Sequence, residues 1–285
     1  FAQAERHARD AVARLGDRAR NSAVRCAAAR SLGTVLRVLS RYDEAERHLR
    51  AAVRWARRLG PHELAASQNA LGMLFKYTGR YAEAVRLYSG ALHALEALFG
   101  CHDVRLTPIL HNLGGVEHAR GQFAHGEAYA RRGLAIRRRW LGHDHVQVAA
   151  DEVALGALLE GQGRLGDAAR LYRRALRVFE HSYGRGHYEV AVTCNNLGTI
   201  AYARGRNAEA LAFYRRSLRI KARMFGDGHP DVAVTRDNLA IVNRSLGRHA
   251  RGARPVYPRA LRVRARVRPG APPRAAVSGQ PGAAV

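Results

Sequence analysis

The sequence predicts an all-α protein, a solenoid built from antiparallel helix pairs. Three observations predict it: a Leu that recurs at a fixed interval, Gly turns at matching places between its copies, and a composition that favours packed helices. Hydrophobic residues make up 47% of the chain and are mainly Ala, Leu and Val. Ala and Leu are the strongest helix formers, and no run reaches the length of apolar residues that a membrane helix needs.

The recurring Leu sets the register of the first helix of each pair. Its copies stand 42 residues apart, after a first interval of 39: Leu32, Leu71, Leu113, Leu155, Leu197 and Leu239. Apolar residues recur seven before this Leu (Leu64, Leu106, Val148, Val190, Val232) and three after it (Leu74, Val116, Leu158, Ile200, Val242). Offsets of −7, 0 and +3 lie on one face of a helix, so the pattern indicates a helix and not a strand.

The second helix of each pair follows a Gly turn. The turns are Gly79-Arg80, Gly121-Gln122, Gly163-Arg164, Gly205-Arg206 and Gly247-Arg248, and Gly there can take the left-handed conformation that ends a helix. A small residue follows the Leu directly (Gly33, Gly72, Gly114, Gly156, Gly198, Ala240), and Tyr88, Ala130, Tyr172 and Tyr214 stand seventeen after it. We expect the small residue to let the two helices approach and the Tyr to fill the space beside it.

This order of Leu-Gly, a small residue and an aromatic resembles the tetratricopeptide repeat. The 42-residue period, with phrases such as HPDVAVTRDNLA, is similar to the kinesin-light-chain type. The resemblance covers roughly residues 1–250 and implies a right-handed α-solenoid (superhelix) whose concave groove binds a partner. The aromatic that the family often carries four after the Leu is present as Phe75, but its later counterparts are Glu117, Leu159, Ala201 and Asn243.

The repeats divide the chain as follows. We expect a second helix of a truncated repeat at 1–16, repeats at 22–59, 63–99, 104–141, 146–183 and 188–225, a degenerate sixth at 230–267, and a disordered tail at 268–285. FAQAERHARDAV at the start matches YDEAERHLRAAV at 42–53, so we expect a fragment of a longer protein. Pro255 and Pro258 stand where the second helix of the sixth repeat should be.

Charge and cysteine content limit the function classes. The formal charge is +25 and almost all of it is Arg, with only Lys76 and Lys221 as lysines. Coding bias accounts for such a composition, although a polyanion site stays open. Three scattered cysteines without a C-x-x-C favour a reducing, cytoplasmic setting. Phosphate-loop, H-E-x-x-H and G-x-S-x-G motifs are absent, so we expect no enzyme, cofactor or metal.

Histidines recur just before the first helices, as His145, His187 and His229. Equivalent residues on neighbouring packed helices lie about 8–10 Å apart, which is too far for ligands of one zinc ion. We therefore expect these histidines to cap or order the loops. The loop position of Cys101-His102 has the same interpretation, since no third catalytic group accompanies it.

Polar residues recur on the first helices at offsets −2, −1 and +5 from the recurring Leu. The family resemblance implies that this side of the helices lines the groove. An Asn side chain offers a donor and an acceptor together, which suits the backbone of an extended peptide. The candidate partner-binding residues are Asn69, Lys76, His111, Asn112, His118, Asn195, Asn196, Tyr202, Asn238 and Arg244. Alternatively, the Asn side chains satisfy neighbouring helix ends. Val153 and Ala154 interrupt the series.

The function that follows is a protein–protein interaction scaffold that binds a peptide or helical segment of a partner. Two alternatives stay open. One is an Arg-rich binder of nucleic acid, which would use the second helices and the basic C-terminal segment. The other is the regulatory or sensor region of a larger signalling enzyme. The sequence indicates no membrane partner.

Overall fold

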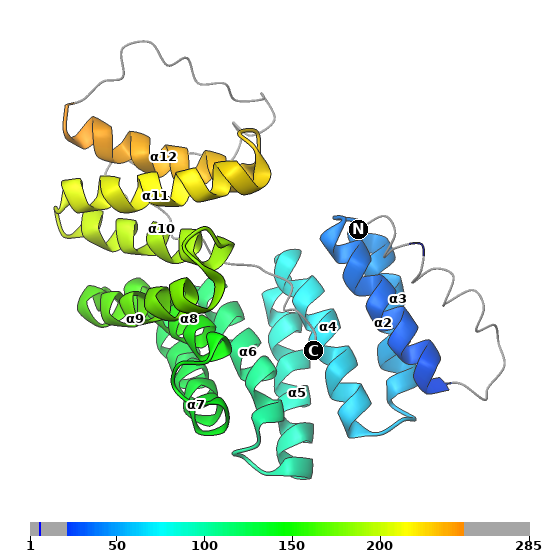
Figure 1. Cartoon of the computed structure of the whole chain (residues 1–285). Helices are drawn as coiled ribbons and strands as arrows, with labels where there is room; N and C mark the ends of the chain where they lie inside the picture. Colours follow the sequence, from blue (N-terminus) through cyan, green and yellow to red (C-terminus); the bar gives the residue numbers. More distant parts are fainter. Residues whose placement is uncertain (1–5, 7–21, 248–285) are drawn as a thin grey trace. The chain divides into compact units, whose positions relative to one another are not determined.

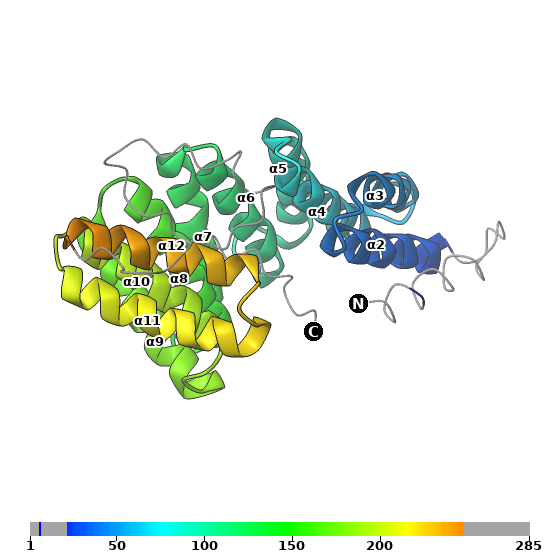
Figure 2. The same ribbon diagram turned by 90° about the horizontal axis from the view of Figure 1, so that it is seen from above.

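The computed structural model describes residue 6 and residues 22–247, and helices with short turns make up this part of the chain (Figures 1 and 2). No strand occurs in the described ranges. The chain divides into two compact units, Phe1–His143 and Asp144–Val285, which are described separately below. The 42-residue pattern runs through this division without a break and does not predict it.

The described residues of unit 1 form three antiparallel helix pairs. They are α2 (Ser22–Val38) with α3 (Tyr42–Ala56), α4 (Pro61–Tyr77) with α5 (Tyr81–Phe99), and α6 (Thr107–Ala119) with α7 (Phe123–Leu141). A short 3₁₀ helix, η2 (Val104–Leu106), precedes α6. Within this unit, α3 also packs on α4 and α5 packs on α6, and the first helices α2, α4 and α6 contact one another in order.

Unit 2, as far as residue 247, forms two complete pairs and one further first helix. The pairs are α8 (Val146–Gly161) with α9 (Leu165–Tyr183) and α10 (Tyr188–Ala203) with α11 (Asn207–Phe225), and α12 (Pro230–Ser245) packs on α11. The truncated repeat expected at 1–16, the second half of the sixth repeat and the tail at 268–285 lie outside the described residues, except for Arg6. The all-α solenoid of helix pairs is confirmed.

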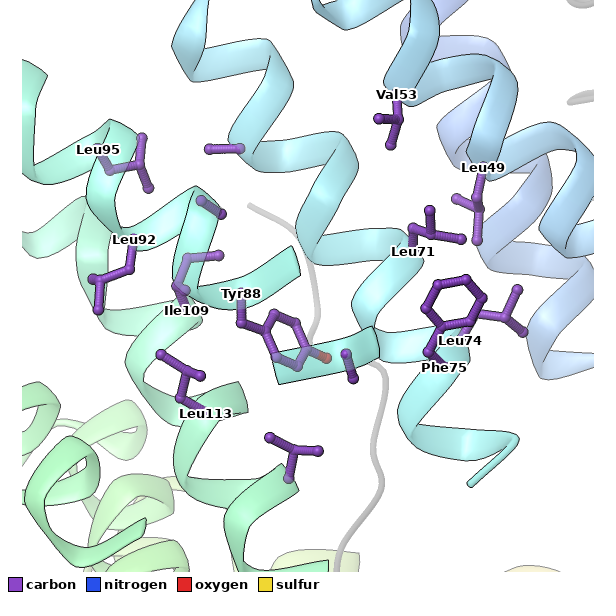
Figure 3. Close-up of a cluster of buried hydrophobic side chains, with 14 of the residues drawn as sticks. Leu49, Val53, Leu71, Leu74, Phe75, Tyr88, Leu92, Leu95, Ile109 and Leu113 are labelled. Atoms are coloured by element: carbon purple, nitrogen blue, oxygen red, sulfur yellow. The ribbon is translucent and has the colours of Figure 1, made fainter. Parts of the chain in front are cut away.

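The recurring Leu forms the core between the two helices of each pair. Leu32, Leu71, Leu113, Leu155 and Leu197 are all buried, as the −7, 0, +3 pattern predicts. Figure 3 shows the arrangement in unit 1, where Leu71 and Leu74 of α4 lie close to Leu49 of α3. Each first helix therefore buries one face against its own second helix, and within a unit each second helix packs on the following first helix, so the contributions of the pairs to stability are expected to be nearly additive within a unit.

The small residue after the Leu makes room for the aromatic ring of the second helix. A Cβ added to Gly72, Gly156 or Gly198 would lie 2.5–2.7 Å from Cε1 of Tyr88, Tyr172 or Tyr214, respectively. The third pair differs because it has Ala130 instead of Tyr. A Cβ added to Gly114 would lie 3.5 Å from the Ala130 Cβ, which is an ordinary contact.

The turn glycines have the conformation that the sequence predicts. Gly79, Gly121, Gly163, Gly205 and Gly247 all have φ between +65° and +79°. In the first pair the equivalent residue is Ser40, which adopts φ +60° although it carries a side chain. The turn geometry is therefore kept even where the sequence lacks the Gly that favours it.

The recurring histidines cap the first helices of unit 2. Nδ1 of His145, His187 and His229 accepts a hydrogen bond from the backbone N–H two residues later, at 3.2–3.3 Å. The His187 ring also packs on Tyr183, at 4.2 Å between ring centroids, and the His229 ring on Phe225, at 4.4 Å. The prediction that these histidines cap or order the loops is confirmed.

Candidate protein-binding face

We define the binding face by offsets −2, −1 and +5 from the recurring Leu on the first helices. In unit 1 it carries the candidates Asn69, Lys76, His111, Asn112 and His118, and in unit 2 Asn195, Asn196, Tyr202, Asn238 and Arg244. The three offsets point along one side of each helix because −2 and +5 are two turns apart. The face is described below for each unit by itself.

An amide pair joins neighbouring first helices in unit 1. Nδ2 of Asn112 on α6 donates to Oδ1 of Asn69 on α4 at 2.7 Å. The residue at offset −1 of one helix thus bonds the residue at offset −2 of the helix before it. His111 lies beside Asn112 and is half-buried. Part of each amide is therefore used within the fold, in a bond between two side chains and not at a helix end.

Two basic groups of unit 1 come together at offset +5. Lys76 crosses onto α6, where a Cβ added to Gly115 would lie 2.7 Å from its Nζ. Burial lowers the pKa of Lys76. Burial and, second, the nearby charge of Lys76 also lower the pKa of His118, whose ring packs on Phe123 at 5.4 Å between centroids. Lys76 forms no ion pair with any described residue.

Arg37 is a third basic residue at offset +5 of unit 1, and it is not among the residues predicted from the sequence. It stands at +5 from Leu32 on α2, so the signal was present once Leu32 had been aligned. Its side chain is only 5% exposed, and its Nη2 has no hydrogen-bond partner among the described residues. The guanidinium carbon lies 4.7 Å from the centre of the Tyr77 ring, and its charge also acts on the buried Tyr88.

In unit 2 the amides lie deeper than the sequence suggests. Asn195, Asn196 and Asn238 are all buried, and Nδ2 of Asn238 donates to Oδ1 of Asn195 at 3.2 Å, the same pairing as in unit 1. Nδ2 of Asn195 and Oδ1 of Asn196 have no hydrogen-bond partner in the described part of the chain. The residue of α8 that would pair with Asn196 in this scheme is Val153, which cannot form a hydrogen bond through its side chain.

Offset +5 of unit 2 is chemically different from that of unit 1. Oε2 of Glu160 accepts a hydrogen bond from the Tyr172 hydroxyl at 3.0 Å, and burial raises the pKa of Glu160 to about 7. Tyr202 is half-buried against the small cluster around Tyr214, and Arg244 is exposed on α12. Offset +5 of unit 2 thus holds a carboxyl, a phenol and one exposed guanidinium, whereas the same offset of unit 1 holds basic residues.

Several arginines of the second helices form ion pairs. Arg131 bonds Glu127 within α7, Arg132 bonds Glu96 at 2.5 Å, and Arg216 bonds Glu180. These contacts neutralise part of the positive charge that suggested a nucleic-acid partner. Within residues 22–247, no group of three or more His, Cys, Asp and Glu residues could hold a metal ion. In the same residues, no helix is both long and apolar enough to cross a bilayer.

The fold and the recurring polar face define a helical-repeat protein. Residues 24–97, 106–181, 154–223 and 189–266 match a family model described as tetratricopeptide repeat. The chain therefore belongs to the tetratricopeptide repeat family. Such repeats make it a protein–protein interaction scaffold, and members of this kind are typically not enzymes.

Solved structures of kinesin-light-chain-like repeat proteins share the fold. The crystal structure of BtubC (BKLC) from P. vanneervenii is 24% identical, with a TM-score of 0.63, and the match covers 80% of this chain and 91% of that one. A putative kinesin light chain with nearly identical repeats from Podosopora anserina is 19% identical, with a TM-score of 0.59 and coverage of 70% and 97%. No curated protein matches the chain.

Proposed function

We propose that this scaffold binds an extended segment of a partner protein along the binding face of its first helices. The observation that carries the proposal is the pair of unsatisfied amide atoms on α10. Asn195 Nδ2 and Asn196 Oδ1 are a buried donor and a buried acceptor on consecutive residues, and neither has a partner within the described residues. A peptide backbone presents one C=O and one N–H per residue and would satisfy both.

The energetics support a ligand at this place. Leaving a buried donor or acceptor without a partner costs about 1–3 kcal/mol. The fold carries this cost at two neighbouring atoms of α10, whereas the amides Asn112 and Asn69 bond each other in unit 1. A ligand that approaches α10 and pairs both atoms would recover the lost hydrogen bonding, which favours binding at α10.

The test begins with affinity capture of partners at two salt concentrations, followed by titration of the captured partner against variants. We expect Asn195→Ala combined with Asn196→Ala to weaken binding about tenfold or more, with helicity unchanged, because two charge-free hydrogen bonds contribute about 1–3 kcal/mol together. Asn207→Ala, on the second helix α11, is the matched control and should bind as the parent does.

Two results count against the proposal. If the double variant binds the partner with unchanged affinity, the partner does not bind through Asn195 and Asn196, and the proposed binding face is wrong. Capture that vanishes at moderate salt, together with a steeply salt-dependent gel shift with nucleic acid, would favour the polyanion alternative instead.

A further inference from the structure

We propose that Glu160 and the tyrosine side chains beside it form a site, on the binding face of unit 2, for one positively charged side chain of the partner segment, Lys or Arg. The inference rests on the proposed function and adds the chemistry of the ligand at one defined position. This contact to a side chain comes in addition to the backbone contacts proposed for Asn195 and Asn196.

The Glu160 carboxylate lies at the binding face and is only partly used by the fold. It stands five residues after Leu155 on α8, and its side chain is half-buried. Oε2 accepts a hydrogen bond from the Tyr172 hydroxyl at 3.0 Å, whereas Oε1 has no hydrogen-bond partner among the described residues. One oxygen of the carboxylate is therefore free to accept a hydrogen bond from a ligand.

Glu160 also lacks a counter-charge in the part of the chain that the structure describes. The carboxylates of the second helices α9 and α11 each pair with an arginine: Asp167, Glu180 and Glu209. A buried charge without such a partner is costly. Burial raises the pKa of Glu160 to about 7, although the hydrogen bond from Tyr172 acts in the opposite direction. A ligand cation would compensate the charge that the fold leaves unpaired.

The groups that face Glu160 from the neighbouring helices are tyrosines. Tyr172 comes from α9, and Tyr202 holds offset +5 on the next first helix, α10, where it is half-buried. Tyr214 of α11 is buried and donates its hydroxyl proton to Thr199 at 3.1 Å. Burial raises the pKa of Tyr214, and the nearby charge of Glu160 adds to the rise. No described Arg, Lys or His side chain acts on the carboxylate.

This arrangement favours a cation over other ligand groups. The attraction between opposite charges is stronger away from bulk water, and the faces of aromatic rings also attract cations. An acidic ligand group would meet a like charge. Lys and Arg carry their charge at the end of a long, flexible stem, so a segment that lies along the first helices can place the charge at Glu160.

The experiment immobilises the full chain and measures the retention of four fluorescent pools of dodecapeptides at pH 8. Each pool has degenerate Ser, Thr, Ala and Asn residues around one fixed central residue, which is Lys, Nε-acetyl-lysine, norleucine or Glu. We expect the Lys pool to bind at least about tenfold more tightly than the acetyl-lysine pool, because hydrogen bonds between charged groups are the stronger ones.

The dependence on pH tests whether the carboxylate itself makes the contact. Only ionised Glu160 binds a cation, and with a pKa of about 7 roughly a tenth of the molecules are ionised at pH 6 and roughly nine tenths at pH 8. We therefore expect the Lys pool to bind about tenfold more tightly at pH 8 than at pH 6, and the acetyl-lysine pool to bind equally at both.

Three variants assign the effect to this site. In Glu160→Gln, the Lys pool should lose both its advantage and its pH dependence. Tyr172→Phe removes the hydrogen bond that lowers the pKa of Glu160, so the midpoint of the pH dependence should move to higher pH. Glu209→Gln, which replaces a carboxylate of α11 that pairs with Arg206, is the matched control and should behave as the parent does.

Three results overturn the inference. They are equal binding of the Lys and acetyl-lysine pools at pH 8, tighter binding of the Glu pool than of the Lys pool, and a Lys preference that survives Glu160→Gln. If the captured partner depends on Asn195 and Asn196 but binds Glu160→Gln as tightly as the parent, the proposed function stands and the cation site fails.

Discussion

At the scale of single residues, a Gly on the first helix lets the Tyr ring of the second helix pack directly against the helix backbone, and this contact sets how closely the two helices approach. Tyr172 lies against Gly156 and Tyr214 against Gly198, so the small residue is required by its neighbour and not by the helix itself. Gly in a helix interior costs about 1 kcal/mol relative to Ala. The cost is retained wherever the second helix supplies a Tyr.

The third pair offers a matched test of this reasoning. Gly156→Ala should lower the free energy of unfolding by about 1–3 kcal/mol, because its Cβ would lie 2.5 Å from the Tyr172 ring. Gly114→Ala should be neutral or should stabilise by up to about 1 kcal/mol, because Ala130 leaves space. Urea denaturation measures both, and equal destabilisation by the two variants would contradict the packing account.

Glu160 is a second residue with a measurable consequence. Burial raises its pKa from 4.5 to about 7, so the folded state favours the neutral acid. The stabilisation is complete below pH 4.5 and is lost as pH rises through about 7. Relative to Glu160→Gln, the parent should lose on the order of 2 kcal/mol of stability between pH 5 and pH 8. Unfolding midpoints at several pH values measure this, and parallel pH profiles would refute it.

At the scale of elements, the start of α10 depends on a side chain that titrates, His187. His187 Nδ1 can accept the Glu189 N–H only when the ring nitrogen carries no proton. Burial lowers the pKa of His187 below its ordinary 6.5, in agreement with a neutral cap.

We therefore expect the cap to stabilise α10 fully above pH 6.5 and to lose this contribution as pH falls through the folded-state pKa. His187→Ala should destabilise the protein by about 1 kcal/mol at pH 8 and by less at pH 5. Thermal melts at both pH values measure the difference. A larger effect of the substitution at pH 5 would mean that the protonated ring is the stabilising form.

The sequence predicts the elements well because their signals are local and repeated. The 42-residue recurrence of Leu, Gly and Tyr places first helices, turns and second helices, and the burial of Leu113, Leu155 and Leu197 confirms the register. The start of α4 at Pro61 rather than at 63 reflects the helix-starting preference of Pro, which the apolar pattern does not contain. The division of the chain into repeat domains stays a prediction.

The binding face was harder to predict because its state depends on neighbouring helices. Offsets −2, −1 and +5 identify its residues, but the burial of Asn195 and Asn196 and the pairing of Asn112 with Asn69 require the next helix to be in place. Arg37 stands at offset +5 on α2, but the candidate series begins only with the repeat of Leu71. A periodic pattern also carries no information about which cations lack a partner.

At the scale of the whole molecule, the chain divides at His143 and Asp144 into units with different chemistry at offset +5. Unit 1 has Arg37, Lys76 and His118 there, and unit 2 has Glu160, Tyr202 and Arg244. We propose that this difference in side-chain chemistry contributes to the choice of partner.

The most direct test of the scaffold account is site-specific photo-crosslinking of the captured partner. A benzophenone amino acid would replace Tyr202 on the binding face, and in a matched variant Arg139 on the second helix α7. We predict adducts with one continuous segment of the partner from position 202 and none from position 139. Adducts that form from position 139 and not from position 202 would place the interaction on the second helices and contradict the account.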